Sequence, residues 1–146
     1  MYTCTGEMLR FLILFSAIET GSSHYFAFSA IVKPSVYDGA NPTMLDFLFS
    51  TPNAVFDGHH RVRCPLTGIY ALHLSIYGQR CAAIVHESTE IAYVIASGGQ
   101  ASNMAVLMCH KGEFVWVHTC EGTNSGTLTQ PLASIFSGYL INAIST

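Results

Sequence analysis

The chain has 146 residues, of which only 10% are charged while 50% are hydrophobic and 12% are aromatic. This length corresponds to one domain, and the apolar content excludes intrinsic disorder, which requires low hydrophobicity and high charge. Six basic against nine acidic side chains give a formal charge of −3, which excludes the basic stripe of a general nucleic-acid binder.

The first apolar segment covers residues 9–18 and is interrupted by Arg10 and Ser16. A membrane span needs about 20 apolar residues, so no span is expected here. A basic residue followed by a short apolar run is typical of a secretory signal. We interpret residues 1–23 as a signal peptide or N-terminal extension, with a strand or short helix packed on the domain as the alternative. Residues 24–146 then form the domain.

Beyond residue 24 the chain alternates between short apolar runs and turn residues. Helical periodicity is not sustained after residue 20, and the runs have the length and spacing of strands. The pattern therefore predicts an all-β sandwich or barrel. In chain order, the expected strands cover residues 25–32, 45–49, 62–64, 69–76, 81–86, 91–96, 104–109, 114–119 and 135–144.

Both faces of the expected strands are substantially apolar. A sheet with one face in water should alternate apolar and polar residues. Along residues 69–76, however, the polar side chains on the second face are only His73 and Ser75, next to Ile69 and Ala71. Obligate interfaces resemble a domain core cut in half, so this pattern predicts that the outer faces meet another subunit.

Five short motifs occur in order along the chain. The last, S-I-F-S-G-Y-L-I, resembles the closing strand of the complement C1q globular domain. K-G-E-F-V-W-V resembles that family's G-D-x-V-W strand, with Glu113 in place of Asp. The five motifs lie in residues 27–30, 53–57, 63–70, 111–117 and 134–141, and the resemblance covers about residues 24–144.

This resemblance implies a ten-stranded antiparallel jelly-roll sandwich of the TNF/C1q type that forms homotrimers. It also implies a secreted, extracellular protein that binds carbohydrate or microbial-surface ligands, as a lectin-like pattern-recognition molecule of innate immunity. The alternative is a cytokine-like or cerebellin-like signalling ligand that binds a protein receptor. A collagen repeat is missing from the sequence, so a role that needs a collagen stalk is not expected.

The family fold has both termini at its base and places alternate loops at its apex. Gly, Asn, Gln and Thr dominate these apical loops, and functional groups concentrate on loops of this kind. The expected loops cover residues 38–41, 79–80, 98–103 and 121–130. The expected ligand-binding residues are Asp38, Asn41, Gln79, Arg80, Gln100, Asn103, Glu121 and Asn124.

Metals and cofactors are not expected. The adjacent pair His59 and His60 makes a poor chelate, because neighbouring residues on a strand point to opposite faces. Calcium is not favoured, since Asp38 and Glu121 are the only acidic residues of the apical loops and calcium prefers several oxygen ligands.

Five cysteines are present, with no C-x-x-C pair. The family topology brings Cys81 and Cys120 to the apical ends of neighbouring strands, which predicts that they pair. The sequence contains no G-x-S-x-G, P-loop or H-E-x-x-H motif, so no enzyme activity and no catalytic residues are expected.

Overall fold

A computed structural model describes residues 25–33, 36–37, 44–49, 56–58, 60–120, 126–127 and 134–145. The interpretation of residues 1–23 as a signal peptide or extension therefore lies outside the described residues. Within these ranges, no helix has the length and apolar character needed to cross a membrane.

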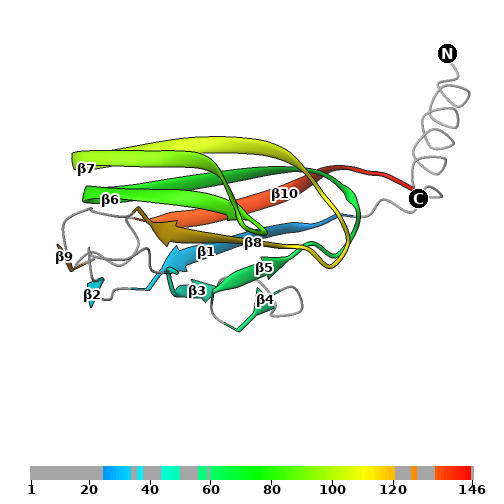
Figure 1. Ribbon diagram of the computed structural model, residues 1–146, viewed down its shortest axis with the longest axis horizontal. Coiled ribbons are helices and arrows are strands. Elements are labelled where there is room, and N and C mark those ends of the chain that lie inside the picture. Colours follow the sequence, from blue (N-terminus) through cyan, green and yellow to red (C-terminus); the bar gives the residue numbers. More distant parts are fainter. Residues whose placement is uncertain are drawn as a thin grey trace, which may run out of the picture.

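The regular structure of the described ranges consists of strands, which confirms the all-β class (Figure 1). Apolar and β-branched residues dominate them, as is usual for a pleated, half-buried surface. In chain order the strands are β1 (Ala27–Val32), β2 (Val36–Tyr37), β3 (Phe47–Phe49), β4 (Phe56–Asp57), β5 (Arg61–Arg63), β6 (Gly68–His86), β7 (Thr89–Cys109), β8 (Phe114–Thr119), β9 (Gly126–Thr127) and β10 (Ile135–Ala143).

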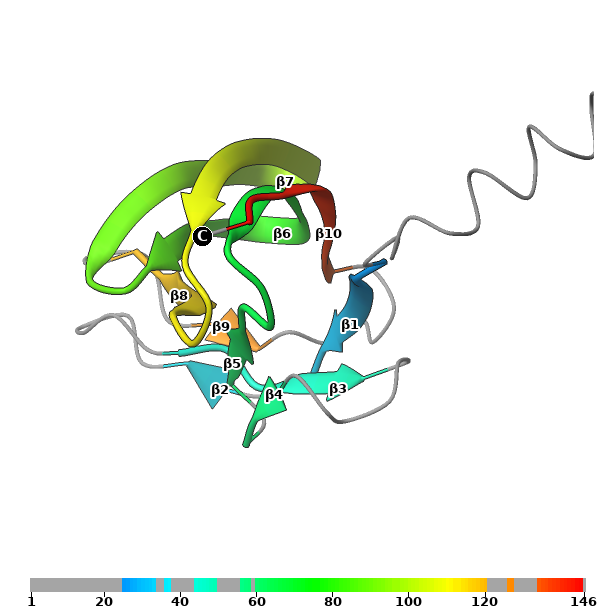
Figure 2. The same ribbon diagram turned by 90° about the vertical axis from the view of Figure 1, so that its right-hand side faces the viewer.

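One antiparallel sheet has the order β3-β1-β10-β6-β8-β5-β4, with β7 also beside β6, and β2 pairs with β9 separately. The first half of β6 pairs with β10 and its second half pairs with β8. Because β6 belongs to both halves, the sheet curls into two layers around a core (Figure 2). The first layer contains β3, β1, β10, the first half of β6 and the second half of β7. The second layer contains β8, β5, β4, the second half of β6 and the first half of β7.

Strands β6 and β7 are longer than the sequence pattern predicts, at 19 and 21 residues. The turn residues near Gly78 and Gly98 read as loops, but they are bends within one continuous antiparallel pair. Positive φ angles of 109° and 92° at these two glycines let both strands turn from one layer into the other. Residues 79–80 and 98–103 are therefore strand residues, which corrects their assignment to loops.

The two ends of the sandwich are distinguished by the strand termini. At the apical end β10 begins, β8 ends and β6 bends. Ser75, just before the bend of β6, is opposite Ile135, the first residue of β10. The N–H of Cys120, just after β8, donates to the carbonyl of Cys81, just after the same bend, at 3.1 Å. At the basal end β10 ends and β8 begins, and Ala143 is opposite Gly68. The turn between β6 and β7 also lies at the basal end.

An aromatic cluster fills the core between the layers. The Phe136 ring is fully buried and lies 5.1 Å from the Phe28 ring and 5.6 Å from the Phe47 ring, measured between centroids. Such aromatic pairs add to the stabilisation gained from buried area alone. Tyr139, three residues later on β10, is 53% exposed, so the two aromatic side chains do point to opposite faces.

Gly138 on β10 leaves room for this cluster, and replacing it with alanine is expected to destabilise the fold. A Cβ at this position would lie 2.6 Å from Cε1 of Phe28 and 2.7 Å from Cδ2 of Leu72, two buried side chains. Overpacking of this kind costs about 1–3 kcal/mol, which urea unfolding would measure. Gly99→Ala is the control, because a Cβ there meets nothing within 4 Å. Equal losses for the two variants would contradict the packing argument.

Candidate functional site

A small hollow opens between the two layers at the apical end. Its volume is about 20 Å³, which is room for about one water molecule, and its walls are mainly apolar. Ser134 is fixed there, because its Oγ accepts a hydrogen bond of 3.1 Å from the N–H of Tyr77. The residues that line the hollow are Val32, Leu45, Ile76, Arg80, Cys81, Ala82, Thr119 and Ser134.

Arg80 is the expected ligand-binding residue that the structure places at this hollow. It lies two residues after the Gly78 bend and is opposite Ala96 in β7. It is also the one residue among those lining the described hollow that carries a permanent charge. Because the recess has room for only about one water molecule, a ligand would contact its mouth, where an arginine side chain can bind an anionic or hydroxyl group.

Gln100 and Asn103, two other expected binding residues, use their side chains within the fold. Gln100 Nε2 donates to Ser75 Oγ at 2.8 Å. Asn103 Nδ2 donates to the carbonyl of Tyr93 at 2.9 Å, which ties the two halves of β7 together. These bonds give both amides a structural role that spacing alone could not reveal.

The remaining expected site residues are not brought together by the described structure. The backbone of Gln79 lies in β6. Four others fall outside the described residues, so their assignment stays a prediction; they are Asp38, Asn41, Glu121 and Asn124.

Two disulfides join the described strands, one at each end of the sandwich. Cys81–Cys120 closes the apical end with Cα atoms 5.3 Å apart, which confirms the predicted pairing. Cys64–Cys109 closes the basal end with Cα atoms 6.4 Å apart, and the sequence analysis missed it. The signal for the second pair was the continuous β6–β7 register, which places Cys109 opposite Gly68 and so near Cys64.

An exposed apolar surface covers the outward face of the first layer, and we call it the first-layer face. The pairing register places side chains of three neighbouring strands next to one another on this face. Tyr139 of β10 is opposite Ala71 of β6, which is opposite Val106 of β7. Met104 is 58% exposed and Val106 is 59% exposed. Exposed apolar patches rimmed by polar residues mark interaction sites. The large exposed side chains of this face are Met104, Val106, Met108, Tyr139 and Ile141.

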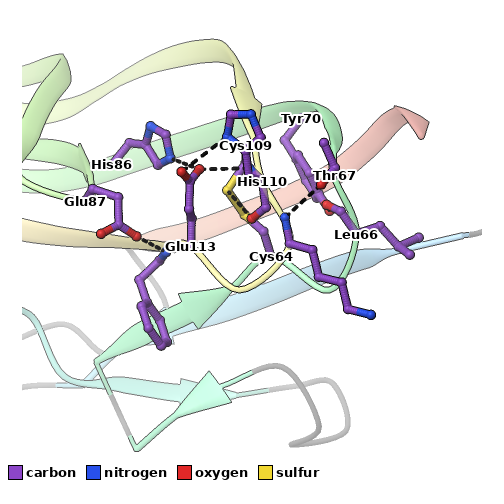
Figure 3. A network of polar contacts seen from close by, with 11 residues as sticks. Cys64, Leu66, Thr67, Tyr70, His86, Glu87, Cys109, His110 and Glu113 are labelled. Carbon is purple, nitrogen blue, oxygen red and sulfur yellow. Dashed lines mark hydrogen bonds and ion pairs between the residues drawn. A yellow bond between two sulfur atoms is a disulfide. The ribbon is translucent and has the colours of Figure 1, made fainter. Parts of the chain in front are cut away.

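A polar network occupies the basal end beside the Cys64–Cys109 disulfide (Figure 3). The carboxylate of Glu113 meets His86 Nε2 at 2.8 Å and His110 Nδ1 at 3.2 Å. Hydrogen bonding by the His110 backbone N–H, together with both imidazoles, lowers the pKa of Glu113 below its ordinary value. This carboxylate therefore stays ionised to a lower pH than an ordinary glutamate does.

A second histidine–carboxylate contact lies on the outward face of the second layer. His118 Nε2 lies 2.6 Å from Glu90 Oε1, and the Tyr93 hydroxyl donates to the other oxygen of Glu90. These bonds, that from Tyr93 first, lower the pKa of Glu90. The arrangement resembles the basal network but contains a single imidazole.

Comparison with known families shows to which family this domain belongs. The family model described as the C1q domain matches residues 27–141. The chain belongs to the C1q domain family. The strands that carry the motifs found in the sequence are the strands that build the two layers of this C1q domain.

Solved structures share the jelly-roll fold of this C1q domain at low sequence identity. The globular domain of zebrafish complement 1qA is 23% identical, with a TM-score of 0.57, over 83% of this chain and 100% of that chain. Murine APRIL is 13% identical, with a TM-score of 0.65, over 81% and 100%. Eiger TNF from S. frugiperda is 14% identical, with a TM-score of 0.58, over 84% and 96%. No curated protein sequence matches the chain significantly.

Proposed function

We propose that this C1q-domain protein is a secreted homotrimer that recognises carbohydrate or microbial-surface ligands through its apical end. It acts by binding and not by catalysis. The two disulfides support an extracellular location, because such bonds persist in oxidising compartments.

The observation that carries the proposal is the first-layer face. Two copies of the same chain are the partners that this surface fits, because its apolar side chains sit on regular strands that leave few charges to desolvate. Burying such a surface stabilises association in proportion to the apolar area removed from water. Association through this face would also remove from water part of the apolar surface of a chain with only 10% charged residues.

Trimer formation would make weak apical sites effective. Three hollows, each with an Arg80, would point the same way on one assembly. Sites linked in this manner bind a repetitive surface at high effective concentration, so avidity exceeds the affinity of each site. Glycans on a microbial surface are repetitive in this sense.

A glycan array tests the recognition step. We expect the oxidised protein to bind a subset of immobilised glycans, and Arg80→Ala to weaken this binding at least tenfold. The matched control is Arg63→Ala, because Arg63 is an exposed arginine at the basal end, opposite Phe114. Its binding should stay within twofold of the unmodified protein.

The alternative function predicts a different result from the same sample. A signalling ligand would leave the array blank and capture one receptor protein from a cell surface. That pair of results would overturn glycan recognition and favour the alternative. Equal losses for the Arg80 and Arg63 variants would place the recognition site away from the apical hollow.

A further inference from the structure

We infer that acidification dissociates the proposed homotrimer, and that His73, on the first-layer face, is the group whose protonation separates the subunits. The inference rests on the proposed function, because it adds a regulation to the same subunit contact. Its physical basis is the contrast between His73 and the other histidines of the described ranges. Each of those has a carboxylate beside it, and His73 has none.

His73 lies on the first-layer face among apolar side chains. It is exposed, whereas Leu72 and Leu74 on either side of it are buried, so its imidazole belongs to the outward face. Met104 is directly opposite it in β7, and Ser137 is directly opposite it in β10. A subunit contact that buries this face therefore buries the imidazole as well.

The strands of the first layer contain a single side chain that changes charge near neutral pH. Aspartate, glutamate, lysine and arginine are missing from the sequences of β1, β3, β10, the first half of β6 (residues 68–78) and the second half of β7 (residues 99–109). Histidine ordinarily changes charge between about pH 5 and 8, and His73 is the only histidine of these strands. Its protonation therefore sets the charge of the whole face in that range.

The neighbours of His73 within the subunit do not offset a positive charge. The adjacent outward side chains on β7 and β10 are Ser102, Met104, Val106, Ile135, Ser137 and Tyr139. The Tyr139 hydroxyl is the only titratable group among these neighbours, and phenols are neutral in this pH range. In the separate subunit, water stabilises the protonated imidazole, and that water leaves when the face is buried.

A second copy of the chain has its described carboxylates already engaged. Each of them is bonded to a group of its own subunit. The pairs are Asp46 with His60, Asp57 with Arg61, Glu87 with the N–H of Phe114, Glu90 with His118, and Glu113 with His86. Pairing one of these carboxylates with His73 of a neighbouring subunit would break one of these bonds. The neutral imidazole needs no such partner, so the subunit contact favours the neutral form.

Acid weakens the assembled state because burial without a counter-charge disfavours the charged imidazole. Three protons must therefore leave when three protonated subunits assemble. Each released proton changes the association constant about tenfold per pH unit where the separate subunits are protonated. Three protons then change the three-body constant about a thousandfold per pH unit. Assembly is strongest above about pH 7 and weakens as the pH falls towards about 5.

The fold of the subunit is expected to stay intact over the same pH range. Hydrogen bonds lower the pKa of Glu90 and of Glu113, so the stability that these carboxylates contribute is lost only below the ordinary glutamate pKa of about 4.3. The imidazoles of His118 and His86 gain their charge beside these ionised groups. Acid would then separate intact subunits, and the apical sites would lose their avidity for a repetitive ligand.

Fluorescence-detected sedimentation velocity of the full oxidised chain tests the inference at about pH 7.5 and about pH 5.5. A dilution series at each pH gives the concentration at which half of the protein is assembled. This concentration varies as the square root of the three-body constant, so a thousandfold change in the constant is a change of about 30-fold in concentration. We expect it to be at least about tenfold higher at the acidic pH, with an unchanged near-ultraviolet circular dichroism spectrum.

Three variants assign the effect to one residue. His73→Gln keeps a neutral polar side chain at both pH values, so its half-assembly concentration should change less than about twofold between them. His118→Gln is the matched control, because it makes the same change on the outward face of the second layer and should keep the full pH response. His73→Lys carries a permanent charge and should be monomeric at both pH values, while its circular dichroism spectrum shows that the subunit is folded.

The possible outcomes separate this inference from the proposed function. A trimer whose half-assembly concentration is the same at both pH values would overturn the inference and leave the proposed homotrimer standing. Acid dissociation that persists in His73→Gln would also overturn it, since another group would then be responsible. A monomer at about pH 7.5 would overturn the proposed homotrimer and this inference with it.

Discussion

Replacing Val106 with glutamate is expected to convert the proposed homotrimer into monomers at micromolar concentration. Val106 lies within the first-layer face and is 59% exposed in the single chain, so the change leaves the core of the subunit intact. In the assembly, however, it places a charge in every subunit contact. A buried charge without a partner costs several kcal/mol, and the trimer contains three copies. Sedimentation velocity measures the resulting change in mass.

Ile95→Glu is the matched control for this prediction. Ile95 is 69% exposed and also lies on β7, but it is opposite Cys81 in the second layer. This variant has the same change in charge on a surface that the proposed assembly leaves free, and it should stay trimeric. A trimeric Val106 variant, or dissociation of both variants, would show that the first-layer face is not the subunit contact.

Removing the Cys64–Cys109 disulfide by a double change to alanine is expected to lower the free energy of unfolding by about 4 kcal/mol. The bond closes a loop with a sequence separation of 45 residues, and the entropy that it removes from the unfolded chain corresponds to about that value. Domains of this size are stabilised by only about 5–15 kcal/mol. The variant should therefore unfold at much lower urea concentration.

The control for the disulfide is Cys4→Ala in the full 146-residue chain, because Cys4 is the cysteine that neither disulfide uses. It should leave the urea midpoint unchanged under oxidising conditions. With excess reductant, the unmodified protein should lose at least as much stability as the double variant, because Cys81–Cys120 is also opened. A loss below about 1 kcal/mol in the double variant would contradict the entropy argument.

The layers of the fold could be predicted because local pattern determines them. Apolar runs bounded by Gly and Pro gave the strand positions, and motif order gave the family. The continuity of β6 and β7 could not be predicted in this way. Gly78 and Gly98 carry the signal of a loop, but the structure uses their positive φ angles to bend a strand without breaking its pairing.

The disulfides also show that local sequence patterns predict only part of the structure. Cys81 and Cys120 could be paired because the topology implied by the family resemblance places both at the apical end. Pairing Cys64 with Cys109 required the full register of β6 against β7, which a division into separate strands hides.

The functional residues were the hardest to predict because they depend on side-chain partners. Asn103 and Gln100 are polar residues near a bend, which is typical of a binding loop, but both amides bond within the domain. His86 and Glu113 are 27 residues apart and show no motif, but they are in contact. Contacts of this kind follow from tertiary register and not from local spacing.

The mass of the native protein tests the central claim most directly. Light scattering at micromolar concentration gives this mass, and denaturing mass spectrometry of the same sample gives the mass of one subunit. If this C1q-domain protein is a homotrimer, the native mass is three times the subunit mass. For the full chain of 15.9 kDa, the native mass is then about 48 kDa. A ratio of one would contradict the account, since the first-layer face would then be exposed and the apical sites would act singly.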